Sequence, residues 1–109
     1  MPDVMADRRA APRYALILVA EVTDLVSGAK MNARTSDVSR TGCYVDTLNP
    51  APPGSRIHLR LSQGEECFET EAKVIYVSQG LGMGVAFQNP SAQHLAILDR
   101  WLAIAAASS

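Results

Sequence analysis

Apolar and polar residues alternate with a period of two through most of residues 14–88, and short turn sequences interrupt the alternation. Successive side chains of a β-strand point to opposite faces of a sheet, so this pattern predicts short strands with one buried face. The clearest run is 56–61, in which Ile57, Leu59 and Leu61 take every second position. The predicted strands cover 14–24, 30–36, 43–47, 56–61, 67–77 and 83–88. In the 67–77 run, the residues expected to share one face are Phe68, Thr70, Ala72, Val74 and Tyr76.

The period changes to that of a helix after residue 88. Asn89 is a good N-cap and Pro90 suits the first helical position, which predicts a helix over about 91–106. Its apolar stripe consists of Leu95, Leu98, Trp101, Leu102 and Ala105. Six strands followed by one amphipathic helix predict an all-β fold: a six-stranded antiparallel β-barrel, which leaves no exposed sheet edge, with a C-terminal α-helix packed on it. Residues 1–13 show neither period and are predicted to be a flexible arm, and 14–109 to be one barrel domain.

Composition limits the classes of function. The chain has 109 residues, of which 48% are hydrophobic and 19% charged, as in a globular domain. Its net charge of −1 argues against nucleic-acid binding by bulk electrostatics, and its aromatic content of 6% is low for a base-stacking barrel. The apolar run 14–20 is too short to span a bilayer, and the acidic start lacks the apolar core of a signal peptide, which predicts a cytoplasmic protein without membrane insertion. Cys43 and Cys67 lie too far apart for a C-x-x-C unit and are predicted to be free thiols.

Two short motifs carry the chemistry of a candidate ligand site. The first is Arg8-Arg9-Ala10-Ala11-Pro12-Arg13, and the second is Asp37-Val38-Ser39-Arg40-Thr41-Gly42. An arginine fork matches the O6 and N7 acceptors of guanine, and a carboxylate accepts from the donors on its other edge. Each motif alone has a plainer interpretation, because basic residues near a terminus are usually solvated and Asp, Ser and Gly are common turn residues. Their co-occurrence favours a guanine-nucleotide site.

The two motifs together resemble those of the PilZ domain family, whose members bind the bacterial second messenger cyclic di-GMP. The resemblance extends from Arg8 to Phe87 and includes the segments 41–47, 53–57 and 82–87. Tyr76 stands where many relatives have tryptophan, and Ala86 where a charged residue is common, so contacts from these two positions are not carried over.

The resemblance implies a role for each motif residue. Arg9 and Arg13 would hold guanine edges and phosphates, Asp37 and Ser39 would bond a guanine, and Gly42 would let the chain turn without a Cβ clash. In relatives, an arginine directly before the R-x-x-x-R part of the first motif, here Arg9 to Arg13, favours a stacked pair of ligands, and that residue here is Arg8. Arg40 is as plausibly a solvated surface residue as an auxiliary cation.

Other motifs do not indicate further chemistry. Gly80, Gly82 and Gly84 lack the helix that a dinucleotide-binding loop requires, and a turn and a crowded strand explain them better. His58 and His94 have no partners at metal-ligand spacing, so neither a metal nor another cofactor is predicted. No nucleophile with a base and no paired carboxylates can be identified, which argues against an enzyme.

The sequence therefore favours a non-enzymatic receptor. Cyclic di-GMP would order residues 6–13 against the barrel, and the new surface would signal to an unidentified protein partner. The alternative is a ligand-independent interaction module of a motility or secretion apparatus. A nucleic-acid-binding barrel is the third and least supported of the binding functions.

Overall fold

The computed structural model describes residues 11–108, which form seven strands and one helix. The strands are β1 (Tyr14–Ala15), β2 (Val19–Asp24), β3 (Lys30–Val38), β4 (Gly42–Asp46), β5 (Arg56–Gln63), β6 (Glu66–Ser78) and β7 (Gly82–Gln88). The helix is α2 (Ala92–Ser108). Residues 1–10 and 109 lie outside the described part of the chain, and with them Arg8 and Arg9.

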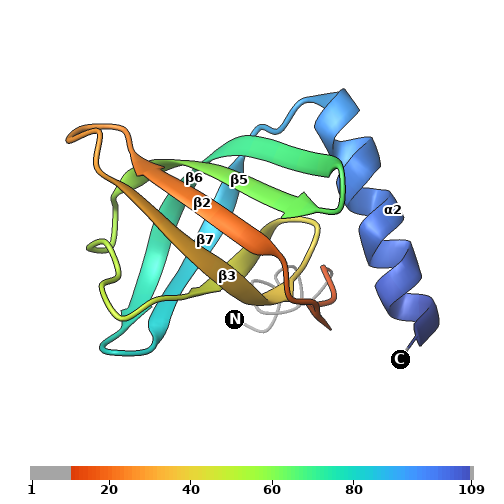
Figure 1. Cartoon of the computed structure of the whole chain (residues 1–109), viewed down its shortest axis with the longest axis horizontal. Helices are drawn as coiled ribbons and strands as arrows, with labels where there is room; N and C mark the ends of the chain where they lie inside the picture. Colours follow the sequence, from red (N-terminus) through yellow and green to blue (C-terminus); the bar gives the residue numbers. More distant parts are fainter. Residues whose placement is uncertain (1–10, 109) are drawn as a thin grey trace, which may run out of the picture.

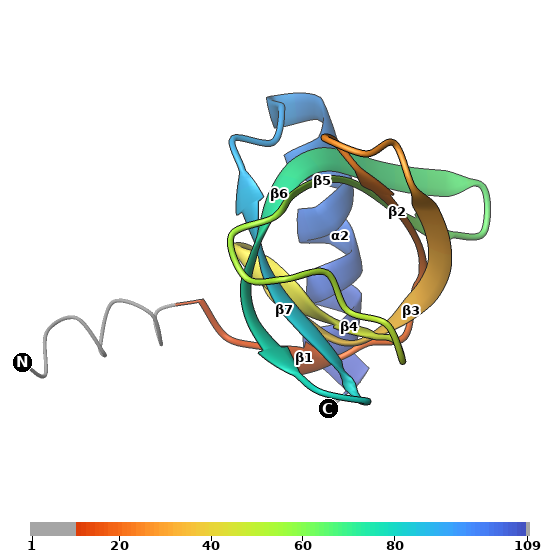
Figure 2. The ribbon, with the colours of Figure 1, turned by 90° about the vertical axis from the view of Figure 1, so that its left-hand side faces the viewer.

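Six of the strands close into a barrel, and α2 lies across one end of it, where Figure 2 shows the helix through the ring of strands (Figures 1 and 2). The sheet order is β1-β3-β2-β5-β6-β7-β4, and a further antiparallel pairing of β3 with β4 completes the ring. The two-residue strand β1 is not part of this ring, because it pairs only with the end of β3. The predicted six-stranded antiparallel barrel with a C-terminal helix is confirmed.

The first predicted strand, 14–24, is interrupted in the structure. The hydroxyl of Thr35, which is buried, donates to the carbonyl of Leu16 at 2.7 Å and accepts from the amide of Leu18 at 2.9 Å. These backbone groups therefore bond a side chain instead of continuing the ladder, and the chain divides into β1 and β2. Because every one of these buried polar groups has a partner, the interruption adds little unfavourable desolvation.

The barrel interior follows the predicted alternation with one exception. Phe68, Thr70, Ala72 and Val74 of β6 are buried as expected, whereas Tyr76 is 48% exposed. The pairing of β6 with β7 shifts register between Val74 and Tyr76, which marks a β-bulge. A bulge inserts one residue and reverses the faces that follow it. The prediction that Tyr76 shares the buried face was therefore wrong.

Helix α2 has its N-cap two residues later than the sequence predicted. Ser91, not Asn89, caps it, since its hydroxyl accepts the amide of His94 at 3.2 Å. Asn89 instead adopts a left-handed conformation with φ of 50°, and Pro90 precedes the cap. The predicted stripe packs against β6 and β1, with Leu98, Trp101 and Leu102 buried. Within residues 11–108, no helix has both the length and the hydrophobicity needed to cross a bilayer.

Candidate functional site

The second motif, 37–42, covers the end of β3, the turn at residues 39–41 and the first residue of β4, and Ser39 holds the turn together. The hydroxyl of Ser39 accepts the amides of Thr41 and Gly42 at 3.2 and 3.1 Å and lies 3.1 Å from the Gly42 carbonyl, to which it donates. The amide of Ser39 also donates to that carbonyl at 2.8 Å. Ser39 is only 1% exposed. In this structure its hydroxyl is committed to the turn, and it does not face the surface where a guanine would contact it.

Asp37 reaches the outer surface because of a second β-bulge. The pairing of β3 with β4 shifts register between Thr35 and Asp37, so that Thr35 and Val38 both point inward and Asp37 points outward. Strict alternation after Thr35 would have buried the carboxylate. β-bulges often re-aim one side chain in this way next to functional sites. The bulge is thus what makes Asp37 available to a ligand.

Gly42 is required by the spacing of two strands. A Cβ at this position would lie 2.2 Å from the backbone carbonyl oxygen of Val85 on β7, closer than any real contact. The backbone of Gly42 does not have a positive φ. The expectation that Gly42 relieves a clash is correct, but the clash is with β7 rather than within the turn.

Arg13 joins the two motifs. Its Nε and Nη2 atoms donate to the same oxygen of Asp37, Oδ1, at 2.9 and 2.7 Å. The two side chains are 48% and 37% exposed. An ion pair this exposed stabilises a protein by only about 0–1 kcal/mol, so it can be exchanged for a better partner at low cost. Residues 24 positions apart are thereby brought into direct contact at the surface.

A hollow of about 220 Å³ lies beside this ion pair. Arg13, Thr41 and Gly42 line one side, and the rest of the lining comes from β6 and β7: Ile75, Tyr76, Gly84, Val85 and Ala86. The ring of Tyr76 lies on Gly84, where a Cβ would approach its Cε2 atom to 2.2 Å. Tyr44 lies beside it, with ring centroids 6.1 Å apart. Asp37 does not line the hollow itself but pairs with Arg13, which does. The hollow and its edge therefore combine a guanidinium, a carboxylate and an aromatic surface, which are groups suited to a nucleotide base.

Sequence reasoning placed Tyr76 in the barrel interior and so missed it as a site residue. Gly84 was the available signal, since a glycine opposite an aromatic residue on the next strand leaves room for the ring to lie flat. Cys43 lies below the site and is fully buried. Burial, reinforced by the charge of Asp37, raises the pKa of its thiol to about 12, so the thiol stays neutral and unreactive.

The sequence profile of the PilZ domain matches residues 7–103, which is most of the chain. The chain belongs to the PilZ domain family. This is a family of ligand-binding receptor domains, and the barrel with its C-terminal helix matches the fold of their structures. The arginine motif and the 37–42 turn both fall within the matched residues. Among curated protein sequences, none matches the chain.

Several solved PilZ structures superpose on this one. The PilZ domain of YcgR from Escherichia coli, solved with c-di-GMP, has a TM-score of 0.76 at 18% identity over 93% of either chain. MotI/DgrA of Bacillus subtilis, an inhibitor of motility, has a TM-score of 0.72 at 19% identity over 86% of this chain and 49% of its own. The PilZ domain of CeSA, from a cellulose-synthesizing bacterium, has a TM-score of 0.65 at 20% identity over 82% of this chain and 92% of its own. At these identities the likeness shows a common fold, and this PilZ chain spans about half the length of MotI/DgrA.

A polar cluster on another side of the PilZ barrel is structural. Nδ1 of His94, on α2, accepts the amide of Glu69 at 3.0 Å, and the Glu69 carboxylate lies 3.0 Å from Nε2 of His58. The hydrogen bond with His58 is the main cause that lowers the pKa of Glu69. His94 therefore helps to attach the helix to β6, and His58 helps to join β5 to β6. Among residues 11–108, no three His, Cys, Asp or Glu side chains are grouped to hold a metal ion.

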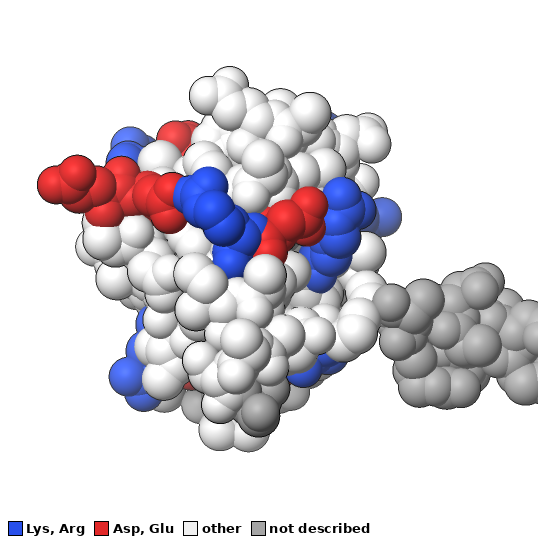
Figure 3. Space-filling model, turned by 90° about the vertical axis from the view of Figure 1, so that its right-hand side faces the viewer, with Lys and Arg blue, Asp and Glu red and all other residues white. Residues whose placement is uncertain are grey.

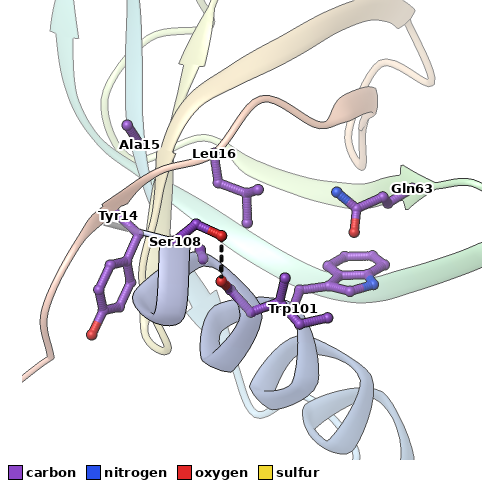
Figure 4. Close-up of a pocket in the computed structure, with 8 residues that line it drawn as sticks. Tyr14, Ala15, Leu16, Gln63, Trp101 and Ser108 are labelled. Carbon is purple, nitrogen blue, oxygen red and sulfur yellow. Dashed lines mark hydrogen bonds between the residues drawn. The ribbon is translucent and has the colours of Figure 1, made fainter.

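A second hollow of about 310 Å³ lies between β1 and the C-terminal part of α2 (Figure 4). Tyr14 and Leu16 line one side, and Trp101 and Ile104 the other. Inside the helix, the hydroxyl of Ser108 donates to the carbonyl of Ile104 at 3.0 Å. None of the described residues that line this hollow is charged, so it lacks the charge-assisted bonds that would favour a phosphate.

Proposed function

We propose that this PilZ domain is a receptor for cyclic di-GMP and binds it at the hollow beside Arg13 and Asp37. The Arg13–Asp37 ion pair carries the proposal, because it brings the two predicted motifs together next to an exposed aromatic ring. The known ligand of the YcgR PilZ domain, whose fold this chain shares, supports the choice of nucleotide.

On binding, Arg13 exchanges its carboxylate partner for the ligand. Both of its bonds now reach a single oxygen of Asp37. A guanine edge or a phosphate offers two acceptors in the plane of the guanidinium, which is the stronger, bidentate arrangement. The carboxylate of Asp37 is then free to accept the N1 and N2 donors of a guanine, and the base lies against the ring of Tyr76.

The size of the hollow requires a second wall. Pockets that enclose a drug-sized ligand measure about 300–1,000 Å³, and the hollow beside Arg13 measures about 220 Å³. Barrel residues alone would leave much of a cyclic dinucleotide exposed. We propose that the 1–13 arm supplies the rest, with Arg9 on a guanine edge or phosphate and Arg8 beside the phosphates. Ordering of this arm is then the change that a protein partner reads.

Arg8 also bears on stoichiometry. Two stacked ligands would bring four phosphates together, and an additional guanidinium offsets their repulsion. We expect two ligands per chain in the unmodified protein and a shift towards one in Arg8→Leu, measured by titration calorimetry. One ligand per chain in the wild type would show that Arg8 does not set the stoichiometry.

Titration calorimetry with cyclic di-GMP, GMP and cyclic di-AMP tests the proposed function. We expect binding of cyclic di-GMP with an affinity at least tenfold higher than that of the other two ligands. Cyclic di-AMP binds more weakly because adenine presents an acceptor at N1 where Asp37 needs a donor, and GMP because it offers one base and one phosphate instead of two of each. Equal affinities for cyclic di-GMP and cyclic di-AMP would contradict the role of Asp37. The absence of any binding by the full chain would overturn the receptor proposal and favour a ligand-independent interaction module.

A further inference from the structure

The 37–42 turn is linked to helix α2 as well as to Arg13. Nε of Arg40 donates to Oδ1 of Asp99, in the middle of α2, at 2.9 Å, across 59 residues of sequence. The helix-bearing face of the molecule carries acidic and basic side chains in alternation (Figure 3), to which this ion pair and the pair between Arg100 and Glu66 contribute. The 37–42 motif therefore forms one ion pair with Arg13, through Asp37, and another with helix α2, through Arg40.

The Arg40–Asp99 pair is easily exchanged. Its side chains are 57% and 48% exposed, and its geometry rests on one short bond rather than on a planar fork. Such pairs contribute little to stability because water solvates both charges when they separate. The buried residues Leu98, Trp101 and Leu102 keep α2 on the barrel whether or not the pair is made.

Arg40 also stands next to the proposed ligand site. The two residues that follow it, Thr41 and Gly42, line the hollow beside Arg13. Among the described lining residues, Arg13 is the one cation, whereas a cyclic dinucleotide brings two phosphate charges. A phosphate offers a guanidinium two acceptor oxygens and a full negative charge, so it competes well with a single exposed carboxylate oxygen.

We propose that Arg40 is a further ligand-binding residue, and that Asp99 holds it away from the ligand in the unliganded protein. This inference rests on the proposed function. When cyclic di-GMP binds, Arg40 moves from Asp99 to a phosphate, and Asp99 is left as an unpaired negative charge on the exposed side of α2. Occupancy of the site is thereby converted into a change of charge on the helix.

Linkage makes the effect reciprocal. If ligand binding frees Asp99, a cationic group binds Asp99 more tightly in the liganded protein. That group must then tighten ligand binding by the same factor. A partner that presents a lysine or arginine to Asp99 would therefore bind the liganded domain in preference to the unliganded one. The helix surface then distinguishes the two states in addition to the ordered arm.

A double-mutant cycle with cyclic di-GMP tests this inference by titration calorimetry at constant, low salt. Asp99→Asn removes the competitor, and we expect it to tighten binding about two- to fivefold, the range that an exposed ion pair allows. Arg40→Gln removes the cation and should weaken binding about five- to tenfold. In the Arg40→Gln background, Asp99→Asn should have no further effect. The matched control is Glu21→Gln, which removes the same charge from an exposed position on β2, opposite Asn32 and Arg60, and should leave the affinity unchanged.

Each other outcome has a distinct meaning. If the unmodified chain binds cyclic di-GMP but Asp99→Asn does not change the affinity, the inference is wrong and the proposed function stands. If Asp99→Asn tightens binding equally with and without Arg40, the effect is a general one of charge, and the inference is again wrong. If the unmodified chain does not bind cyclic di-GMP, both proposals are overturned. Thermal unfolding of each variant verifies the fold, since Arg40 and Asp99 are both surface residues.

Discussion

Replacement of Asp37 by alanine separates recognition of guanine from general attraction of an anionic ligand. The carboxylate has two opposing effects in our account. It accepts the guanine donors in the complex, and it occupies Arg13 in the unliganded protein through bonds of 2.9 and 2.7 Å. Asp37→Ala removes both effects at once, so the measured change is their difference.

The size of that difference follows from the exposure of the groups. A good pair of hydrogen bonds to one base edge contributes about 1–3 kcal/mol of discrimination. Release of Arg13 returns about 0.2–1 kcal/mol, because the pair is more than one-third exposed and screened by solvent. The net loss for cyclic di-GMP is therefore about 1–2 kcal/mol, or roughly five- to thirtyfold in Kd. For cyclic di-AMP only the release of Arg13 remains, and the affinity should rise by up to about fivefold.

Titration calorimetry of both ligands against wild type and Asp37→Ala measures these opposite signs. Asp46→Ala is the matched control, since its carboxylate is 36% exposed and pairs with Arg34 at 3.8 Å at the other end of β4. It should change neither affinity. Equal losses for the two ligands in Asp37→Ala would show that Asp37 shapes the turn without contacting a base, and the reasoning would fail.

Three further predictions address the arginines, the glycine and the polar cluster. Arg13→Ala, and separately Arg9→Ala, should weaken binding of cyclic di-GMP at least tenfold with an unchanged circular dichroism spectrum, because each loses charge-assisted bonds worth about 1.5–3 kcal/mol; unchanged affinity in both variants would refute the site. Gly42→Ala should destabilise the fold by about 1–3 kcal/mol in urea unfolding, because its Cβ meets the β7 backbone, whereas a slight stabilisation would show that only chain flexibility matters there. Glu69→Gln should lower the free energy of unfolding slightly at neutral pH. Because the pKa of Glu69 is lowered in the folded protein, the difference in stability between wild type and variant should shrink as the pH falls below the usual carboxyl range. A difference in stability that grows in acid would contradict the hydrogen bond with His58.

The barrel could be predicted from sequence because its strands obey a simple period. The runs around Leu59 and Phe68 alternate without interruption, and each buried side chain follows from the position of the one before it. The helix was equally clear, because the stripe around Leu98 and Trp101 has the period of a helix and nothing competes with it.

The errors occur where a local feature overrides that period. A bulge exposes Tyr76, and the hydroxyl of Thr35 interrupts the first strand. The exposure of Asp37 was expected, but the bulge that produces it was not. A bulge depends on how two strands pair, so a pattern read along one strand cannot reveal it. The role of Gly42 has the same origin, because the clash that it avoids is with a residue 43 positions away.

The candidate site was predicted in its chemistry but only partly in its geometry. Asp37 and Gly42 lie on either side of the turn at residues 39–41, and Arg13 contacts Asp37, while their contacts with a ligand stay predictions. Ser39 is buried in the turn, and the aromatic surface of Tyr76 was not anticipated. Ligand contacts of Arg8 and Arg9 remain predictions from the motif, since both lie outside the described residues.

Nuclear magnetic resonance of the ¹⁵N-labelled full chain, titrated with cyclic di-GMP, tests most directly whether the ligand binds beside Arg13 and Asp37. We predict that the amide signals of Thr41, Gly42 and Gly84, which line or border the hollow, shift most and reach saturation together. The amide of Gly28, in the hairpin between β2 and β3, should stay unchanged. Shifts centred on the indole of Trp101, in the apolar groove beside α2, or no shifts at all, would contradict the account.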